Sequence, residues 1–150
     1  MEIKYSKKPA NESKAVKALG RDLDISFKDA VTLSNWVSGK NLSTAAAMLE
    51  AVVSLKRAVP YPKYNKGVGH RRGNMKVKTA RYPKKAASAV LDVVKNLQSN
   101  AEYRGLDAEK LKLTHIQAQK GVVRKRKKPK GRYRTWKREF VHVQAVAEEK

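Results

Sequence analysis

Apolar residues recur with two different periods along this chain. Before Gly105 they return every three or four residues in three stretches, which is typical of helices with one buried side. After Gly105 the period falls to two, which is typical of strands with one buried face. The sequence therefore predicts three helices followed by two strands. Residues 14–25, ahead of the first helix, are expected to be extended or irregular.

The first two helices are predicted from their end signals. "SFKDAVTLSNWVSGK" offers Ser26 as an N-cap, Asp29 three residues later and Gly39 just past the end. A second helix is expected from Ser43 to a stop at the prolines of residues 60–62, with two cations in its last turn. Its apolar stripe and those two cations are Met48, Leu49, Val52, Val53, Leu55, Lys56 and Arg57.

The third helix has the clearest pattern. Pro83 is expected in its first turn and Gly105 at its end. One face of it carries Ala86, Val90, Val94, Leu97 and Ala101, and the adjacent face carries Ala87, Leu91 and Gln98.

Two strands are predicted after this helix. "LKLTHIQAQ" changes phase in its middle, which indicates a bulge near His115. "FVHVQAVAE" alternates well, but Phe140 and Val146 do not fit the alternation. Its apolar phase consists of Val141, Val143, Ala145 and Ala147.

Charge changes the picture most. The 150 residues, enough for one domain, carry a formal charge of +22, which a compact body tolerates best when a polyanion neutralises it. Residues 120–138 hold eleven Lys and Arg and no acid. Residues 60–82 form a second basic region, and their glycines and prolines predict a long loop. Nucleic acid is the natural partner, with an anionic membrane surface as the other candidate.

The first basic run lies between the two predicted strands and is interpreted as a β-hairpin over residues 119–141. Pro129 and Gly131 are turn residues at its midpoint, and the tip is expected near residues 128–132. Arms of ten residues reach about 33 Å, whereas a body of this size has a radius of gyration of about 14 Å. Its large apolar groups are only Val122, Val123, Tyr133 and Trp136. Such a ribbon is expected to be loose in the free protein and ordered by phosphates.

Other classes of protein find less support. The chain has no cysteine, no apolar run long enough for a membrane span and no secretory signal, so an intracellular, soluble protein is expected. His70, His115 and His142 are too scattered for a metal site. Glu102 and Asp107 are interpreted as helix-end structure, because no nucleophile or phosphate-binding loop accompanies them. We therefore expect no enzyme, no cofactor and no metal.

Several short motifs together resemble a known family. "SFKDA" and "PKKAA" begin helices, "NAE" and "GLD" close the third one, and "GR" at residues 131–132 lies in the basic hairpin. "VPYPKYNKGVG", residues 59–69, resembles an insertion of archaeal and eukaryotic members. In order and spacing these motifs resemble the universal large-subunit ribosomal protein twenty-two family (number seventeen in eukaryotic naming), in an archaeal form. The resemblance covers nearly the whole chain.

The resemblance implies an α+β fold, with three helices on a small three-stranded antiparallel sheet and a long basic hairpin. It also implies a structural constituent of the large ribosomal subunit, located in the cytoplasm. Its partners would be large-subunit rRNA, neighbouring ribosomal proteins including number four across the exit tunnel, and the nascent peptide in passing. No membrane and no homo-oligomer are expected. The hairpin would line the nascent-peptide exit tunnel with its tip residues Lys127, Lys128, Pro129, Lys130, Gly131 and Arg132.

The candidate rRNA-binding residues combine both basic regions, because guanidinium groups pair with phosphates and flat groups stack on bases. His70 either contacts RNA or is simply solvated. Trp136 either stacks on a base or packs between the arms. The full set is Lys63, Lys66, His70, Arg71, Arg72, Lys76, Lys78, Arg81, Lys84, Lys85, Lys120, Arg124, Lys125, Arg126, Lys127, Lys128, Lys130, Arg132, Tyr133, Arg134, Trp136, Lys137 and Arg138.

Three other functions fit the sequence less well. A DNA-bending protein uses basic β-arms with a proline near the tip, which Pro129 matches, but it needs a dimer face that the sequence does not show. An RNA-modifying enzyme would need a catalytic group, and none is found. A disordered nuclear-import signal fits the charge but not its position between two strands.

Overall fold

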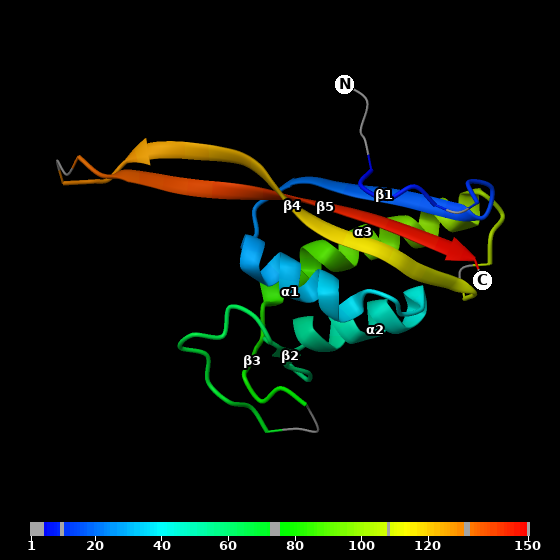
Figure 1. The fold of residues 1–150 in the computed structure, drawn as a ribbon, viewed down its shortest axis with the longest axis horizontal. Coiled ribbons are helices and arrows are strands. Elements are labelled where there is room, and N and C mark those ends of the chain that lie inside the picture. Colours follow the sequence, from blue (N-terminus) through cyan, green and yellow to red (C-terminus); the bar gives the residue numbers. More distant parts are fainter. Residues whose placement is uncertain (1–4, 10, 73–75, 108, 131–132, 150) are drawn as a thin grey trace.

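The computed structural model describes residues 5–9, 11–72, 76–107, 109–130 and 133–149. Three strands form one antiparallel sheet in the order β1-β5-β4, with bounds Ala15–Leu23 for β1, Leu111–Lys127 for β4 and Thr135–Glu149 for β5. Three helices pack below it: α1 at Phe27–Val37, α2 at Leu42–Val53 and α3 at Lys84–Tyr103. Figure 1 shows the sheet above and the helices beneath, so the α+β prediction is confirmed.

The sheet and helices share one apolar core. α1 packs on β4, α3 packs on β1 and β5, and α2 packs mainly on α3. The predicted inner phase of the last strand is confirmed, because Val141, Val143, Ala145 and Ala147 are fully buried. All five predicted residues on the main face of the third helix are buried as well. No helix among the described residues could cross a membrane.

The ends of α1 follow the sequence signals. The Ser26 side chain accepts a hydrogen bond from the Asp29 backbone N–H, and Gly39 adopts a φ of +76° after the helix. α3 begins one residue later than expected, since Pro83 is its N-cap. Gly105, with a φ of +71°, ends it as predicted.

The predicted end of the second helix is wrong. α2 begins at Leu42 behind an Asn41 cap and ends at Val53, so Lys56 and Arg57 lie outside it. Leu55 is 56% exposed rather than part of the apolar stripe. The physical reason is that Leu55 turns into the left-handed region, with a φ of +62°, two residues after the helix ends.

The outer face of the sheet is partly covered, which is why Val146 does not fit the apolar alternation of β5. Val146 is fully buried although it lies in the opposite phase to the core-facing residues of β5. The N-terminal segment crosses this face: the backbone N–H of Ser6 donates to Gln144 Oε1 at 3.2 Å, and Pro9 is buried. A second face is therefore covered by a segment far away in the sequence.

β4 and β5 continue beyond the body as a hairpin (Figure 1). Their ladder runs from Leu111 opposite Glu149 to Lys127 opposite Thr135. The expected bulge near His115 is present, and a second irregularity follows between Lys120 and Val123. The last described bond before the tip runs from the Lys128 N–H to the Arg134 carbonyl, 2.9 Å. Gly131 and Arg132 of the expected tip lie outside the described residues.

Candidate nucleic-acid interface

The hairpin arm, residues 123–127 and 135–139, has no core of its own. Every residue in both stretches is exposed, and Figure 1 shows the arm standing clear of the helices. Arg124 lies opposite Arg138 and Lys125 lies opposite Lys137. Like charges in directly opposed positions destabilise a ladder. The arm therefore presents densely packed cations that an external polyanion would stabilise.

Two aromatic rings hold two of these cations on the arm. The Arg126 guanidinium lies 4.6 Å from the centre of the Trp136 ring, and the Arg124 guanidinium lies 5.1 Å from that of Phe140. Such contacts orient a guanidinium without neutralising its charge. Trp136 thus packs against an arm residue, while 46% of it stays exposed.

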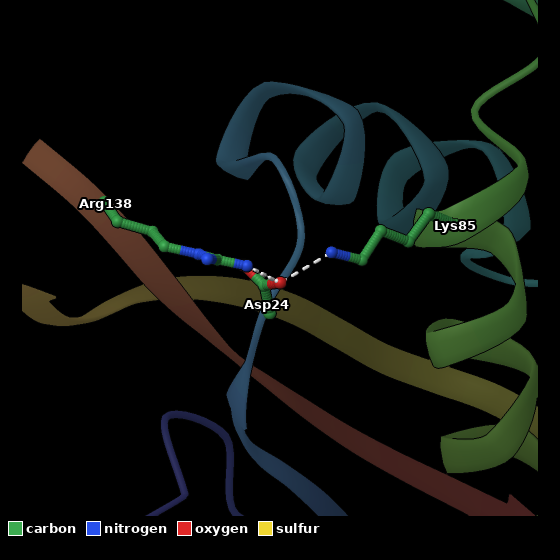
Figure 2. Close-up of polar contacts among 3 residues, drawn as sticks. All are labelled: Asp24, Lys85 and Arg138. Carbon is green, nitrogen blue, oxygen red and sulfur yellow. Dashed lines mark hydrogen bonds and ion pairs between the residues drawn. The ribbon is translucent and has the colours of Figure 1, made fainter.

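One carboxylate ties the base of the hairpin to the body. Asp24, in the connection between β1 and α1, accepts hydrogen bonds from Arg138 Nε at 2.9 Å, from Arg138 Nη2, and from Lys85 Nζ at 2.6 Å. Figure 2 shows the three side chains converging from the hairpin, the β1–α1 connection and the start of α3. These two cations hold the pKa of Asp24 far below its ordinary value, chiefly through hydrogen bonds from Arg138 and then Lys85.

Around this carboxylate lies a groove, here called the basic groove, of about 910 Å³. It is formed where the first turns of α1 and α3 meet the base of the hairpin. Helix starts carry partial positive charge, which adds to that of the lysines. Its cationic side chains are Lys28, Lys84, Lys85, Lys120, Lys137 and Arg138, and its acidic ones are Asp24, Asp29 and Glu139.

The predicted loop of residues 60–82 is anchored at its base. β2 at Val59–Pro60 pairs with β3 at Ala80–Arg81, two short strands that sequence reasoning missed. Tyr61 is buried, and its hydroxyl donates to Asp29 Oδ1 at 2.8 Å. Burial and that hydrogen bond raise the pKa of Tyr61. The loop is therefore fastened to α1 through a buried ring.

The structure exposes the candidate residues but does not gather them into one site. The loop lies below α1 in Figure 1, away from the hairpin. Lys84, Lys85, Lys120, Lys137 and Arg138 share the basic groove. All described candidates are exposed except Lys128, which is half-buried, and Arg132 lies outside the described residues.

The three histidines contact different neighbours. His70 forms an isolated bridge with Thr79, His115 lies 3.0 Å from the Ser6 hydroxyl, and His142 Nδ1 accepts from the Asp22 N–H at 3.0 Å. No group of three potential metal ligands occurs in the part of the chain that the structure describes.

Sequence reasoning missed Asp24, Lys28 and Phe140. Lys28 carried a usable signal, because it lies in the first turn of a predicted helix beside its cap. Asp24 and Phe140 carried none, since their roles depend on which cations the folded sheet brings near them.

Known proteins are similar to this chain over most of its length. Residues 18–148 match the family model described as ribosomal protein L22p/L17e. The large ribosomal subunit protein uL22 of Archaeoglobus fulgidus is 46% identical over 97% of this chain and 96% of its own length. Those of Methanococcus vannielii and Methanocaldococcus jannaschii are 40% and 39% identical, over 93% and 98% of this chain and 93% and 95% of their own lengths. This chain belongs to the ribosomal protein L22p/L17e family.

Proposed function

We propose that this protein is a structural constituent of the large ribosomal subunit that acts in the cytoplasm by binding large-subunit rRNA. Family membership and the names of its archaeal relatives support the ribosomal role. The observation that carries RNA binding is the projecting arm, in which all ten residues of the two paired stretches are exposed and cations oppose one another. RNA phosphates would offset that repulsion and release counterions.

In this proposal the protein has two RNA contacts rather than one. The hairpin arm and the basic groove form the first, and the loop of residues 60–82 forms the second. The separation of the two regions in Figure 1 supports a role in holding distant rRNA segments together during assembly. Such a role is architectural and needs no catalytic group.

The family resemblance extends the proposal to the exit tunnel. The tip, residues 127–132, would line the tunnel, with ribosomal protein four opposite and the nascent peptide passing by. The reach of β4 and β5 beyond the body supports such a placement, because only a projecting element enters a channel walled by RNA.

Co-sedimentation tests the proposal. Tagged full-length chain expressed in its own organism should sediment with the large subunit on a sucrose gradient. A variant lacking residues 125–134 should keep a folded body, because the core lies outside the arm, and should incorporate poorly. Recovery of the full-length chain only as free protein would refute the ribosomal role. Normal incorporation of the shortened chain would refute only the hairpin contact and would leave the ribosomal role standing.

A further inference from the structure

The two faces of the hairpin arm carry different chemistry. Residues directly opposite each other in an antiparallel ladder point to the same face. Arg124 pairs with Arg138 and Arg126 pairs with Trp136, whereas Lys125 pairs with Lys137. The arginine face thus consists of Arg124, Arg126, Trp136, Arg138 and Phe140. The lysine face consists of Val123, Lys125, Lys127, Thr135, Lys137 and Glu139.

An extra residue in β4 creates this separation. From Lys120 to Val123 the strand advances three positions while β5 advances two, from Val141 to Glu139. Gly121 and Val122 therefore share the space opposite one residue, which is a β-bulge. Without it, Lys125 would lie opposite Trp136 and Arg124 opposite Lys137. The bulge thus aligns the arginines with the aromatic rings.

The arginine face combines cations with aromatic rings. Both of its free guanidinium groups lie over rings, at 4.6 and 5.1 Å from the ring centres. Among the residues that the structure describes, no acidic side chain forms an ion pair with Arg124 or Arg126, while Arg138 is bound to Asp24. A hollow of about 350 Å³ adjoins this face, and Lys125 and Lys137 also contribute to its wall.

A guanidinium that lies over a ring keeps its N–H groups free for a bidentate bond to phosphate. Its outer face and the exposed part of the indole can stack on an unpaired base. An ammonium group offers charge without this geometry. The two faces therefore differ in the contacts they can make, although both are cationic.

We propose that the arginine face is the RNA-reading surface of the arm, which pairs with phosphates and stacks on bases, whereas the lysine face supplies diffuse charge. This inference rests on the proposed RNA-binding function and specifies which face of the arm contacts the bases. It predicts that the identity of the cation matters on one face and not on the other.

Two charge-preserving double variants test the assignment. Arg124→Lys with Arg126→Lys removes both guanidinium groups, and Lys125→Arg with Lys127→Arg is the matched control on the same strand. The net charge is unchanged in each, so counterion release is the same. Binding of the full chain to transcribed large-subunit rRNA is measured, with heparin as a polyanion that has no bases. We expect roughly ten-fold weaker rRNA binding for the first variant only. The loss of heparin binding should be smaller, because heparin sulfates accept the bidentate bond but heparin has no base to stack on.

A second readout follows Trp136 directly. The chain has two tryptophans, so a Trp36→Phe background leaves Trp136 as the only indole. We expect rRNA to quench its fluorescence and heparin not to do so. Equal rRNA affinities of the two double variants, or no quenching by rRNA, would overturn the face assignment and leave RNA binding standing. Failure of the wild-type chain to bind rRNA better than heparin would overturn the proposed RNA-binding function as well.

Discussion

At the scale of single residues, Asp24 decides how the hairpin is joined to the body. It is the carboxylate that binds both Arg138 and Lys85, so two of the candidate RNA-binding cations are already engaged within the protein. Sequence reasoning assigned both to RNA because their partner lies more than sixty positions away from the nearer of them. A local pattern does not predict such a contact.

Asp24→Asn should loosen the hairpin base. The amide accepts hydrogen bonds less strongly than the carboxylate and carries no charge for Arg138 and Lys85. We expect several-fold faster amide exchange in residues 136–139 and little change in global unfolding, because the bridge is solvent-exposed. Lys110, which pairs with Asp107 away from the hairpin, supplies the control as Lys110→Gln. Unchanged exchange in Asp24→Asn would show that the bridge does not hold the arm.

The same carboxylate predicts a pH dependence. The pKa of Asp24 is lowered in the folded chain, so its contribution is complete above the ordinary value of about 3.9 and is lost as the pH falls through the lower, folded pKa. Amide exchange at the hairpin base, corrected for its intrinsic pH dependence, should rise below about pH 4 in the wild type and stay flat in Asp24→Asn. A parallel rise in both proteins would assign the effect to other groups.

Tyr61 is the residue on which the loop anchor depends. Tyr61→Phe removes the hydroxyl that donates to Asp29 and should lower the free energy of unfolding by about 1 kcal/mol in urea denaturation. Tyr82→Phe is a suitable control, because the Tyr82 side chain is exposed. Equal stability of the two variants would mean that the buried hydrogen bond contributes nothing.

At the scale of elements, the sequence predicts those structural features that depend on residues close together in the chain. The Ser26 cap, the Gly105 terminator, the bulge near His115 and the inner phase of β5 were all predictable, because each depends on residues a few positions apart. The burial of Val146 was not, since it lies on the outer sheet face, where the distant Ser6 binds Gln144. The cations of the candidate site could likewise be identified from the sequence. Which of them lie opposite each other across the arm depends on the strand register, which a local pattern does not predict.

The second bulge of β4 is an element with a testable requirement. A Cβ at Gly121 would come within 2.9 Å of His142 Nε2 and 3.1 Å of the Phe140 carbonyl oxygen. Gly121→Ala should therefore lower the free energy of unfolding by about 1–3 kcal/mol, because His142 is held by the Asp22 N–H. Gly69→Ala is the matched control, since nothing lies within 4 Å of its added Cβ. Equal stability of the two variants in urea would show that the bulge accommodates a Cβ at Gly121 without loss of stability.

At the scale of the whole molecule, the chain combines a compact body with an arm that lacks a core. The body buries one continuous apolar cluster, whereas the arm has exposed cations and rings. A two-stranded ribbon of this kind is marginal alone in water. The prediction that the arm is loose in the free protein and ordered by RNA stays a prediction.

Hydrogen exchange separates body from arm. Amides of residues 123–127 and 135–139 should exchange faster in the free protein than those of β5 inside the body, such as Val143 and Ala145. In assembled large subunits both sets should be slow. Strong protection of the arm in the free protein would show that it needs no partner to be ordered.

A density map of purified large ribosomal subunits that contain this chain would show directly whether the hairpin arm binds rRNA. We expect nucleotides to surround the hairpin arm, with phosphates and bases against Arg124, Arg126 and Trp136 and the body held nearby through the basic groove. A map in which residues 120–138 lie flat on their own body, or project into solvent with no nucleotide in contact, would contradict this expectation.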